Sequence, residues 1–192
     1  MDTKKFKQQL LDELYAPYIK CTMCPLGSLG RTNVVFGQGD PDANLMFIGE
    51  GPGAKEDAEG RPFIGRSGQL LTKTLENLGV SRQDVYITNI VKCRPPSNRA
   101  PTEAEASTCK SILLNNQIQI IKPKIICTLG ASSLIGLLGK SAKISTLRGT
   151  IQEVNGLKVL PTFHPAYILR NRTKLVTFTQ DLKMAINRAF TE

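Results

Sequence analysis

Apolar runs alternate with helix-like patterns from about residue 44 to the end of the chain. Four short runs, rich in apolar and β-branched residues, have the pattern of buried strands: Asn44–Gly49, Val85–Val91, Lys124–Leu129 and Leu157–Phe163. Between and after them, apolar residues recur every three or four positions, which is the pattern of helices with one buried face. Strands that alternate with helices form a mostly parallel sheet covered on both faces. We therefore predict a three-layer α/β/α sandwich around a four-stranded, mostly parallel sheet.

Local capping signals place the helices between these strands. Ser67 can cap a helix that Gly79 closes, because serine accepts hydrogen bonds from free N–H groups at a helix start. Thr102 and Glu105 form a capping-box pattern that opens a long helix to about Ile121. We find no repeat and no low-complexity linker, so we expect residues 1–192 to form one domain. Two more helices are predicted, over Ala131–Leu138 and around Phe178, Leu182, Ala185, Ile186 and Ala189.

The net charge of +9 is unevenly spread. Residues 140–192 carry nine basic and three acidic side chains, whereas residues 1–49 carry five of each. Such an excess suits a polyanion such as nucleic acid, although a basic surface without a partner is the alternative. The chain has no apolar stretch long enough to span a bilayer and no signal-peptide core. We expect a cytoplasmic protein with no membrane partner.

Polar and glycine residues follow the ends of the predicted strands. In open parallel sheets, ligands bind in the crevice beyond these carboxyl ends. The residues to consider are therefore Glu50–Gly53, Asn89, Gly130 and His164. His164 is the one histidine of the chain, and histidine readily exchanges a proton near neutral pH. The alternative for His164 is a core histidine bonded to a backbone carbonyl.

The glycine-rich turn Gly49–Ala54 formally fits the phosphate-binding GxGxxA pattern of dinucleotide folds. That pattern requires a helix directly after the turn, yet residues 55–62 are highly charged and contain a glycine and a proline. We therefore expect the turn to bring backbone close to another ligand, with Glu50 pointing into the cleft. A carboxylate at the end of a buried strand is costly to desolvate, which favours a functional role over solvation or pairing with an arginine.

Four of the five cysteines have a spacing that allows them to share one metal centre. Cys21 and Cys24 form a CxxC, and Cys93 and Cys109 lie in a later loop and helix. Zinc ribbons usually supply a second CxxC, so this irregular spacing favours an iron–sulfur cluster. A redox pair at the CxxC is the alternative. Cys127 lies in an apolar strand, where cysteine behaves as a small apolar residue.

Five motifs stand in order along nearly the whole chain: Gly49–Gly53, Glu56–Asp57, Gly60–Gly65, Thr88–Pro96 and His164–Tyr167. Together they resemble the family 4 uracil-DNA glycosylases, the iron–sulfur branch of the uracil-DNA glycosylase superfamily. The resemblance implies a monofunctional base excision repair enzyme that flips uracil out of DNA and hydrolyses its N-glycosidic bond to leave an abasic site. It also implies a [4Fe-4S] cluster on Cys21, Cys24, Cys93 and Cys109.

The resemblance further implies roles for the residues around the flipped base. His164 would hydrogen-bond uracil O2 and stabilise the departing anion. Asn89 offers the donor and the acceptor that the O4 and N3–H edge of uracil requires, and cytosine reverses that pattern. Phe63 would stack on the base. Glu50 would orient the attacking water and stabilise the cationic sugar.

The remaining implied roles concern specificity and the DNA backbone. The backbone at Gly51 would approach the base or the water, and Glu56 would exclude the methyl group of thymine. Leu169 or Arg170, expected on a basic loop, would wedge into the duplex. Arg170 and Arg172 would hold phosphates. Arg172 stands where the family often has proline, so we expect a less rigid wedge loop.

The implied partner is uracil-containing DNA, single- or double-stranded, bound by a monomer. Two other functions fit parts of the sequence. An iron–sulfur protein could bind nucleic acid without activity, but the intact set of Glu50, Asn89 and His164 argues against this. A dinucleotide-dependent redox protein could use the glycine-rich turn and the cluster.

Overall fold

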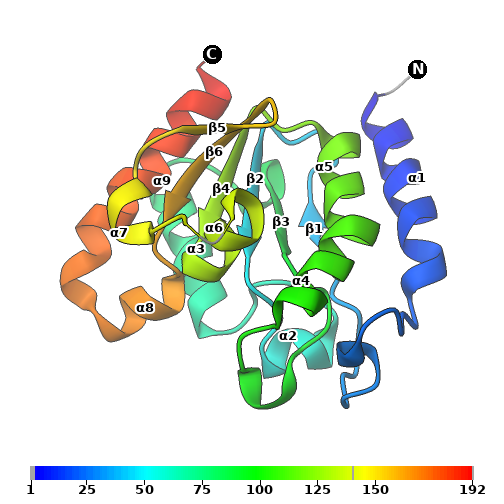
Figure 1. Ribbon diagram of the computed structural model, residues 1–192. Helices are drawn as coiled ribbons and strands as arrows, with labels where there is room; N and C mark the ends of the chain where they lie inside the picture. Colours follow the sequence, from blue (N-terminus) through cyan, green and yellow to red (C-terminus); the bar gives the residue numbers. More distant parts are fainter. Residues whose placement is uncertain (1–2, 140, 192) are drawn as a thin grey trace.

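The computed structural model describes residues 3–139 and 141–191 as a twisted sheet with helices on both faces (Figure 1). The strand order is β1-β3-β2-β4-β6-β5, and the four central strands pair in parallel. The four predicted strands are confirmed, each slightly shorter than expected. They are β2 (Leu45–Gly49), β3 (Tyr86–Asn89), β4 (Ile125–Leu129) and β6 (Leu157–Thr162).

Two short antiparallel strands, which we did not predict, extend the sheet at its edges. β1 (Gln38–Gly39) pairs with β3, and β5 (Gln152–Val154) pairs with β6. Neither has an apolar run, because an edge strand of two or three residues buries little. Asn155 and Gly156 join β5 to β6, both with positive φ (51° and 77°). An Asn-Gly pair is a strong hairpin signal, so β5 could have been found from it.

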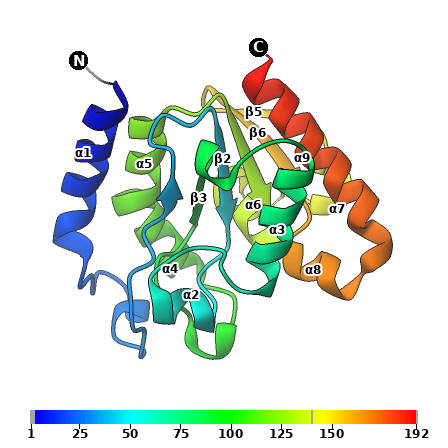
Figure 2. The same cartoon turned by 180° about the vertical axis from the view of Figure 1, so that it is seen from behind.

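Helices cover both faces of the sheet, as predicted. α3 and α9 cover one face of the sheet, which Figure 2 shows by viewing the molecule of Figure 1 from behind. α5 and α1 lie on the other face. Alternate residues of β2 point to opposite faces, so Leu45 and Phe47 join one apolar cluster while Met46 and Ile48 join the other. The helices are α1 (Thr3–Tyr15), α2 (Ala54–Glu59), α3 (Arg66–Asn77), α4 (Glu103–Cys109), α5 (Asn115–Ile121), α6 (Ala131–Leu138), α7 (Ile144–Leu147), α8 (Pro165–Arg170) and α9 (Leu175–Phe190).

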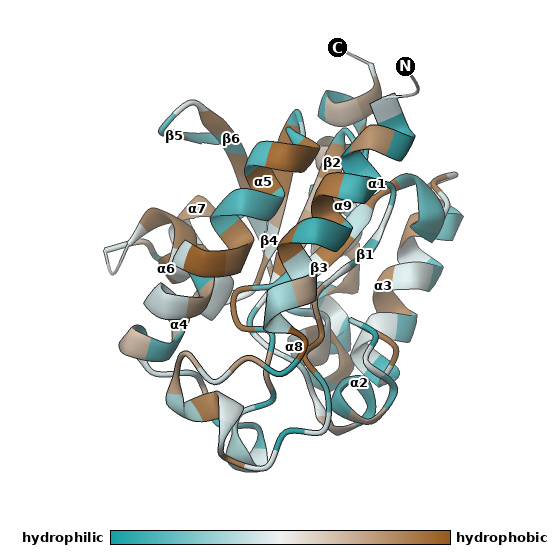
Figure 3. Cartoon of the chain, turned by 90° about the vertical axis from the view of Figure 1, so that its right-hand side faces the viewer, coloured by the Kyte–Doolittle hydropathy of each residue, from teal (hydrophilic) through white to brown (hydrophobic). Residues whose placement is uncertain are grey.

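The predicted final helix is α9, and its five predicted apolar residues are all buried. Figure 3 shows that hydrophilic and hydrophobic residues both occur along α5 and α9, as expected of helices with one buried face. No helix in the described ranges is long and apolar enough to cross a membrane.

The long helix predicted from Thr102 to about Ile121 is confirmed in its start and extent. Thr102 Oγ1 accepts a hydrogen bond from the N–H of Glu105 (3.2 Å), and the Glu105 carboxylate accepts one from the N–H of Thr102 (2.7 Å). The helix is not uniform, because residues 110–114 form a π-helical turn between α4 and α5. Such turns are frequent at functional sites, and this one directly follows Cys109.

The glycine-rich turn runs into the short helix α2, so our expectation that no helix follows it was wrong. Two charged residues of this helix, Glu56 and Asp57, accept hydrogen bonds from backbone N–H groups of neighbouring loops, so their burial in a helix is compensated. Asp57 accepts from the N–H groups of Thr32 (2.9 Å) and Asn33 (3.1 Å). Gly60 ends the helix in the left-handed region, with φ of 70°.

Ser67 does not cap α3, contrary to our prediction. The helix begins at Arg66 with Gly65 as its N-cap residue, which places Ser67 inside the first turn. The carboxylate of Glu56 accepts the N–H groups of Ile64 (2.9 Å) and Gly65 (2.7 Å). The entry into α3 is therefore held by a side chain from α2, which no local pattern reveals.

Candidate functional site

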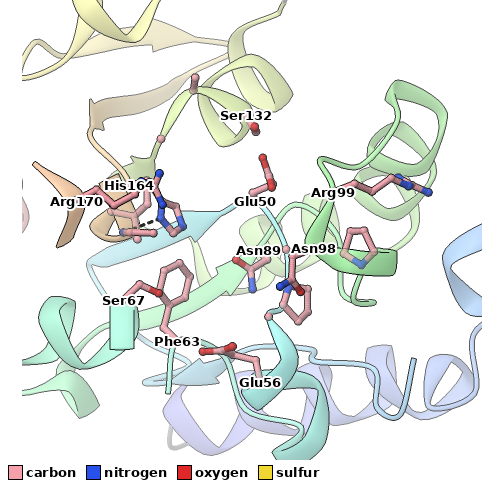
Figure 4. Close-up of a pocket in the computed structure, with 18 residues that line it drawn as sticks. Glu50, Glu56, Phe63, Ser67, Asn89, Asn98, Arg99, Ser132, His164 and Arg170 are labelled. Carbon is pink, nitrogen blue, oxygen red and sulfur yellow. Dashed lines mark hydrogen bonds between the residues drawn. The ribbon is translucent and has the colours of Figure 1, made fainter. Parts of the chain in front are cut away.

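A cleft of about 510 Å³ opens at the carboxyl ends of the parallel strands. The segments that follow β2, β3, β4 and β6 all line it, as the topology predicted. Figure 4 shows Glu50, Asn89, Phe63 and His164 around this space. The cleft thus brings together side chains that are more than a hundred residues apart in sequence.

His164 presents a hydrogen-bond donor to this cleft. It is the N-cap residue of α8, and its Nδ1 accepts the N–H of Ala166 (3.0 Å). A neutral imidazole has one N–H and one acceptor nitrogen, so the proton lies on Nε2. The core alternative supposed a hydrogen bond from the ring to a backbone carbonyl. The bond that fixes the ring instead comes from a backbone N–H.

The imidazole of His164 is neutral at pH 7. Burial, helped by the positive charge of Arg170, lowers its pKa from 6.5 to about 4. Because the unfolded chain binds the proton more readily, the stability that this neutral ring contributes is present above pH 6.5 and is lost as the pH falls toward 4.

Asn89 ends β3 with its side chain at the base of the cleft, only 1% exposed. Its Oδ1 is buried and has no hydrogen-bond partner among the described residues. Buried polar atoms are normally paired, so this oxygen is available to accept from a ligand. Gly49 makes room for it: a Cβ at that position would lie 2.5 Å from Asn89 Oδ1 and would also collide with the Phe63 ring.

Phe63 lies at the cleft wall with its ring centroid 5.8 Å from that of His164. Its Gly/Pro-rich loop argues against a core position, yet Phe63 is 6% exposed and belongs to an apolar cluster. Its φ of 50° is unusual for a non-glycine residue. Arg82 holds this strained loop by donating to the carbonyls of Phe63 (3.0 Å) and Pro62.

The two predicted carboxylates of the cleft have different surroundings. Glu50 is partly buried and takes part in none of the ion pairs found between described residues, so the arginine pairing that we considered is not found there. Glu56 lines the cleft, but one of its oxygens is occupied by the loop before α3. Gly51 lies against Val91, where a Cβ would come within 2.8 Å of its side chain.

The segment after His164 is helical and not the loop that we expected. Leu169 and Arg170 belong to α8, and Arg172 begins the 3₁₀ turn Arg172–Lys174. Arg170 is exposed and lines the cleft. Arg172, two residues later, is also exposed. Leu169 is partly buried and does not line the cleft. The reason for the helix is the His164 cap with Pro165 at the first helical position, a combination that favours helix entry.

Sequence reasoning missed a loop that closes one side of the cleft. Asn98 has φ of 54°, and its Oδ1 accepts from Arg94 Nε (2.8 Å). Arg99 makes two bonds of 2.8 Å to Glu105 and holds the pKa of that carboxyl at about 2. The Pro95-Pro96 pair signals the turn, but nothing local shows that it faces the cleft. The cleft residues absent from our prediction include Ser67, Asn98, Arg99 and Ser132.

Cys21 and Cys24 lie close enough to Cys93 and Cys109 to interact with them electrostatically. Burial, together with the nearby Cys109, Cys21 and Cys24, raises the pKa of Cys93 to about 12, against the opposing charge of Arg31. All are free thiols, and Cys127 is buried separately within β4. Within the described ranges, no three histidine, cysteine or acidic side chains are grouped so that they could hold one metal ion.

The backbone around these cysteines is tightly fitted. The N–H of Lys92 donates to Cys109 Sγ (3.3 Å), and Arg31 donates to the carbonyl of Cys21 (2.7 Å). A Cβ at Gly27 would collide with that same carbonyl. N–H donors to sulfur and a close-wrapped CxxC loop fit thiolate ligands, so the four cysteines are compatible with a cluster.

Comparison with known proteins identifies related sequences. The family model described as the uracil DNA glycosylase superfamily matches residues 36–191. A protein named Type-4 uracil-DNA glycosylase from Thermotoga maritima is 50% identical over 169 residues, which cover 87% of each chain. Proteins of the same name from Pyrobaculum aerophilum and Sulfurisphaera tokodaii are each 43% identical, covering 91% and 94% of this chain and 92% and 86% of theirs.

Proposed function

The chain belongs to the uracil-DNA glycosylase superfamily, and on that premise we propose that the cleft at the carboxyl ends of its strands binds a flipped-out uracil. The protein is a uracil-DNA glycosylase, a hydrolase of N-glycosyl bonds that excises uracil in DNA repair. The observation that carries the site assignment is the unpartnered, buried Oδ1 of Asn89, which lines the same cleft as His164.

Asn89 would read the edge of the base. Its Oδ1 would accept the N3–H of uracil, and its Nδ2 would donate to O4. Cytosine presents an acceptor at N3 and a donor at C4, so the same amide orientation would face two mismatched groups. Phe63 would stack on the ring, a contact typically worth about 1–3 kcal/mol per base. Gly49 supports this arrangement because any larger residue would push both side chains away.

His164 would stabilise the leaving group. When the bond between C1′ of the sugar and N1 of uracil breaks, the electron pair stays on uracil and negative charge develops at O2. The Nε2–H of His164 would donate to that oxygen without transferring its proton, because the imidazole is already neutral. A donor placed where charge develops lowers the barrier, since it interacts more strongly with the transition state than with the ground state.

Glu50 would act on the deoxyribose and on the attacking water. The sugar gains positive charge as uracil departs, and a nearby carboxylate stabilises that charge. The same carboxylate would orient a water molecule whose oxygen bonds to C1′ and whose released proton passes to the carboxylate or to solvent. The backbone at Gly51 would approach the base or this water. Gly51 packs closely on Val91, which follows β3.

Glu56 would exclude thymine by bulk. Its carboxylate is held by the N–H groups of Ile64 and Gly65, so it cannot swing away from the cleft wall without leaving two backbone donors unsatisfied. Outside the cleft, Arg170 and Arg172 would hold phosphates, contacts that weaken as the salt concentration rises. Leu169 or Arg170 would enter the duplex where the base leaves.

We also propose that Cys21, Cys24, Cys93 and Cys109 hold a [4Fe-4S] cluster. Each thiolate of such a cluster binds a different iron, so the four sulfurs need not converge on one point. When bound, the cluster supplies a cross-link between the N-terminal segment, the segment that follows β3 and the end of α4. Its role would be structural, and no step of the hydrolysis requires it.

Replacing Cys109 by alanine should lower the iron content per protein, remove the brown colour and lower the melting temperature. Cys127→Ala is the matched control, because Cys127 is buried in β4 apart from the other four, and it should retain the iron of the unchanged protein. Iron analysis and absorption spectra measure both. Equal iron in the two variants, or a colourless preparation with full activity, would count against the cluster.

The function is tested by incubating the purified protein with uracil-containing and matched thymine-containing oligonucleotides and then cleaving abasic sites with alkali. Strand breaks with uracil alone are expected. Binding without breaks would instead indicate a nucleic-acid-binding protein without activity. That the chain is one domain, a monomer and cytoplasmic stays a prediction.

A further inference from the structure

Lys92 is a fully buried lysine that no step above uses. It follows β3 and has an exposed fraction of 0%. Its Nζ donates to three acceptors: Thr88 Oγ1, the carbonyl of Asn89 (2.8 Å) and Gln117 Oε1 (2.6 Å). An ammonium group has three donors, so each of them is occupied. One of these bonds is to the backbone of the residue that would read uracil.

The acceptors of Lys92 are themselves fixed by a buried network. Thr88 Oγ1 donates to the carbonyl of Phe36 (2.7 Å). Gln117, on α5, donates to that same carbonyl (2.9 Å) and to the hydroxyl of Tyr86 (3.2 Å). The lysine is thus anchored both to the sheet and to the helix that covers it. Removing it would leave several buried acceptors without their donor, which is a costly change.

The backbone of Lys92 extends the network to the cysteine site. Its N–H donates to Cys109 Sγ (3.3 Å). The same residue therefore contacts the sulfur of a proposed cluster ligand through its main chain and the carbonyl of Asn89 through its side chain. No other residue of the described chain has hydrogen bonds to both in the structure.

We propose that Lys92 is a positioning residue for uracil recognition, which it achieves by fixing the Asn89 carbonyl from a buried position outside the cleft lining. This rests on the proposed function, in which the Asn89 side chain reads the base. The carbonyl and side chain of Asn89 branch from one Cα, so a shift of the carbonyl tilts the amide. A displacement of about 1 Å in a site of this kind can lower the rate about a hundredfold.

The test is Lys92→Met, which keeps an unbranched side chain of similar length and removes all three donors. We expect kcat/KM on a uracil-containing oligonucleotide to fall at least about tenfold, with a similar weakening of inhibition by free uracil. Affinity for DNA with an abasic-site analogue should stay within about twofold, because that contact does not involve the base edge. Iron content should be retained, since the bond to Cys109 comes from the backbone.

Two further variants keep the outcome decisive. Tyr86→Phe removes a hydroxyl group that belongs to the same buried network. This hydroxyl bonds to Gln117 and to neither Lys92 nor Asn89, so inhibition by free uracil should be unchanged. Thr88→Val keeps the lysine but removes one of its acceptors, and it should weaken free-uracil inhibition less than Lys92→Met does. If Lys92→Met does not fold, Thr88→Val carries the test.

The proposal is overturned if free-uracil inhibition is unchanged in Lys92→Met or, where that variant does not fold, in Thr88→Val. It is also overturned if uracil and abasic DNA binding fall together, since that indicates general destabilisation. Asn89→Leu, assayed in parallel, separates this inference from the proposed function. If Asn89→Leu keeps normal inhibition by free uracil, the proposed role of Asn89 itself is wrong. If inhibition is weakened in Asn89→Leu but unchanged in Lys92→Met, only the role of Lys92 is overturned.

Discussion

Replacing His164 by alanine is expected to slow cleavage of the uracil N-glycosidic bond by about 10²- to 10³-fold. This is the loss typical of removing one hydrogen-bond donor from a developing anion. The Nε2–H of His164 is the donor that would face uracil O2, and alanine has no group that reaches that position. Duplex affinity should stay within about twofold, because phosphate contacts supply most of it. Single-turnover rates at saturating enzyme and a separate binding measurement distinguish the two effects.

The control for this variant is Tyr167→Phe, which alters the same motif but removes only a hydroxyl from a side chain that does not line the cleft. It should keep the full rate. His164→Ala also removes a helix cap, which typically costs about 0.5–2 kcal/mol, so its melting temperature must be recorded and rates taken well below it. A rate near that of the unchanged protein would refute the role of His164.

Asn89→Leu is expected to lower kcat/KM on uracil-containing DNA by about 10²-fold or more, since two hydrogen bonds to the base edge are lost at about 1–2 kcal/mol each. Leucine has the same number and branching of side-chain heavy atoms as asparagine, so the space beside Phe63 stays filled. The bond from Lys92 to the backbone carbonyl is retained, which confines the change to the base edge. Inhibition by free uracil measures the same loss without the DNA.

The matched control is Asn115→Leu, the same substitution on an exposed position of α5 outside the cleft lining. It should leave both kcat/KM and free-uracil inhibition unchanged. If Asn89→Leu excises uracil as fast as the control does, the base edge is read by another residue and the assignment of the unpartnered oxygen is wrong.

Most of the fold follows from local patterns. The central strands were predictable because each is a continuous apolar run, as strands buried on both faces require. The Thr102 cap and the α9 face were predictable because both depend on residues three or four positions apart. The edge strands escaped prediction because they bury little, and the entry to α3 did so because its cap comes from Glu56 in another helix.

The candidate site was partly predictable for a topological reason. Parallel strands bring their carboxyl ends together, so Glu50, Asn89 and His164 could be grouped from sequence alone. The left-handed backbone of Phe63, the loop at Asn98 and the buried contacts of Lys92 could not be predicted. Each depends on partners that only the tertiary structure brings near, such as Arg82 beneath the Phe63 loop.

The central claim is that a neutral imidazole of His164, with its proton on Nε2, faces the departing uracil. Because the chain has one histidine, ¹⁵N NMR of histidine-labelled protein reports this ring alone. We predict a neutral Nε2–H form at pH 7, a pKa of about 4, and a shift of the Nε2 signal on addition of free uracil. A pKa near the ordinary 6.5, a proton on Nδ1, or no response to uracil would contradict the account.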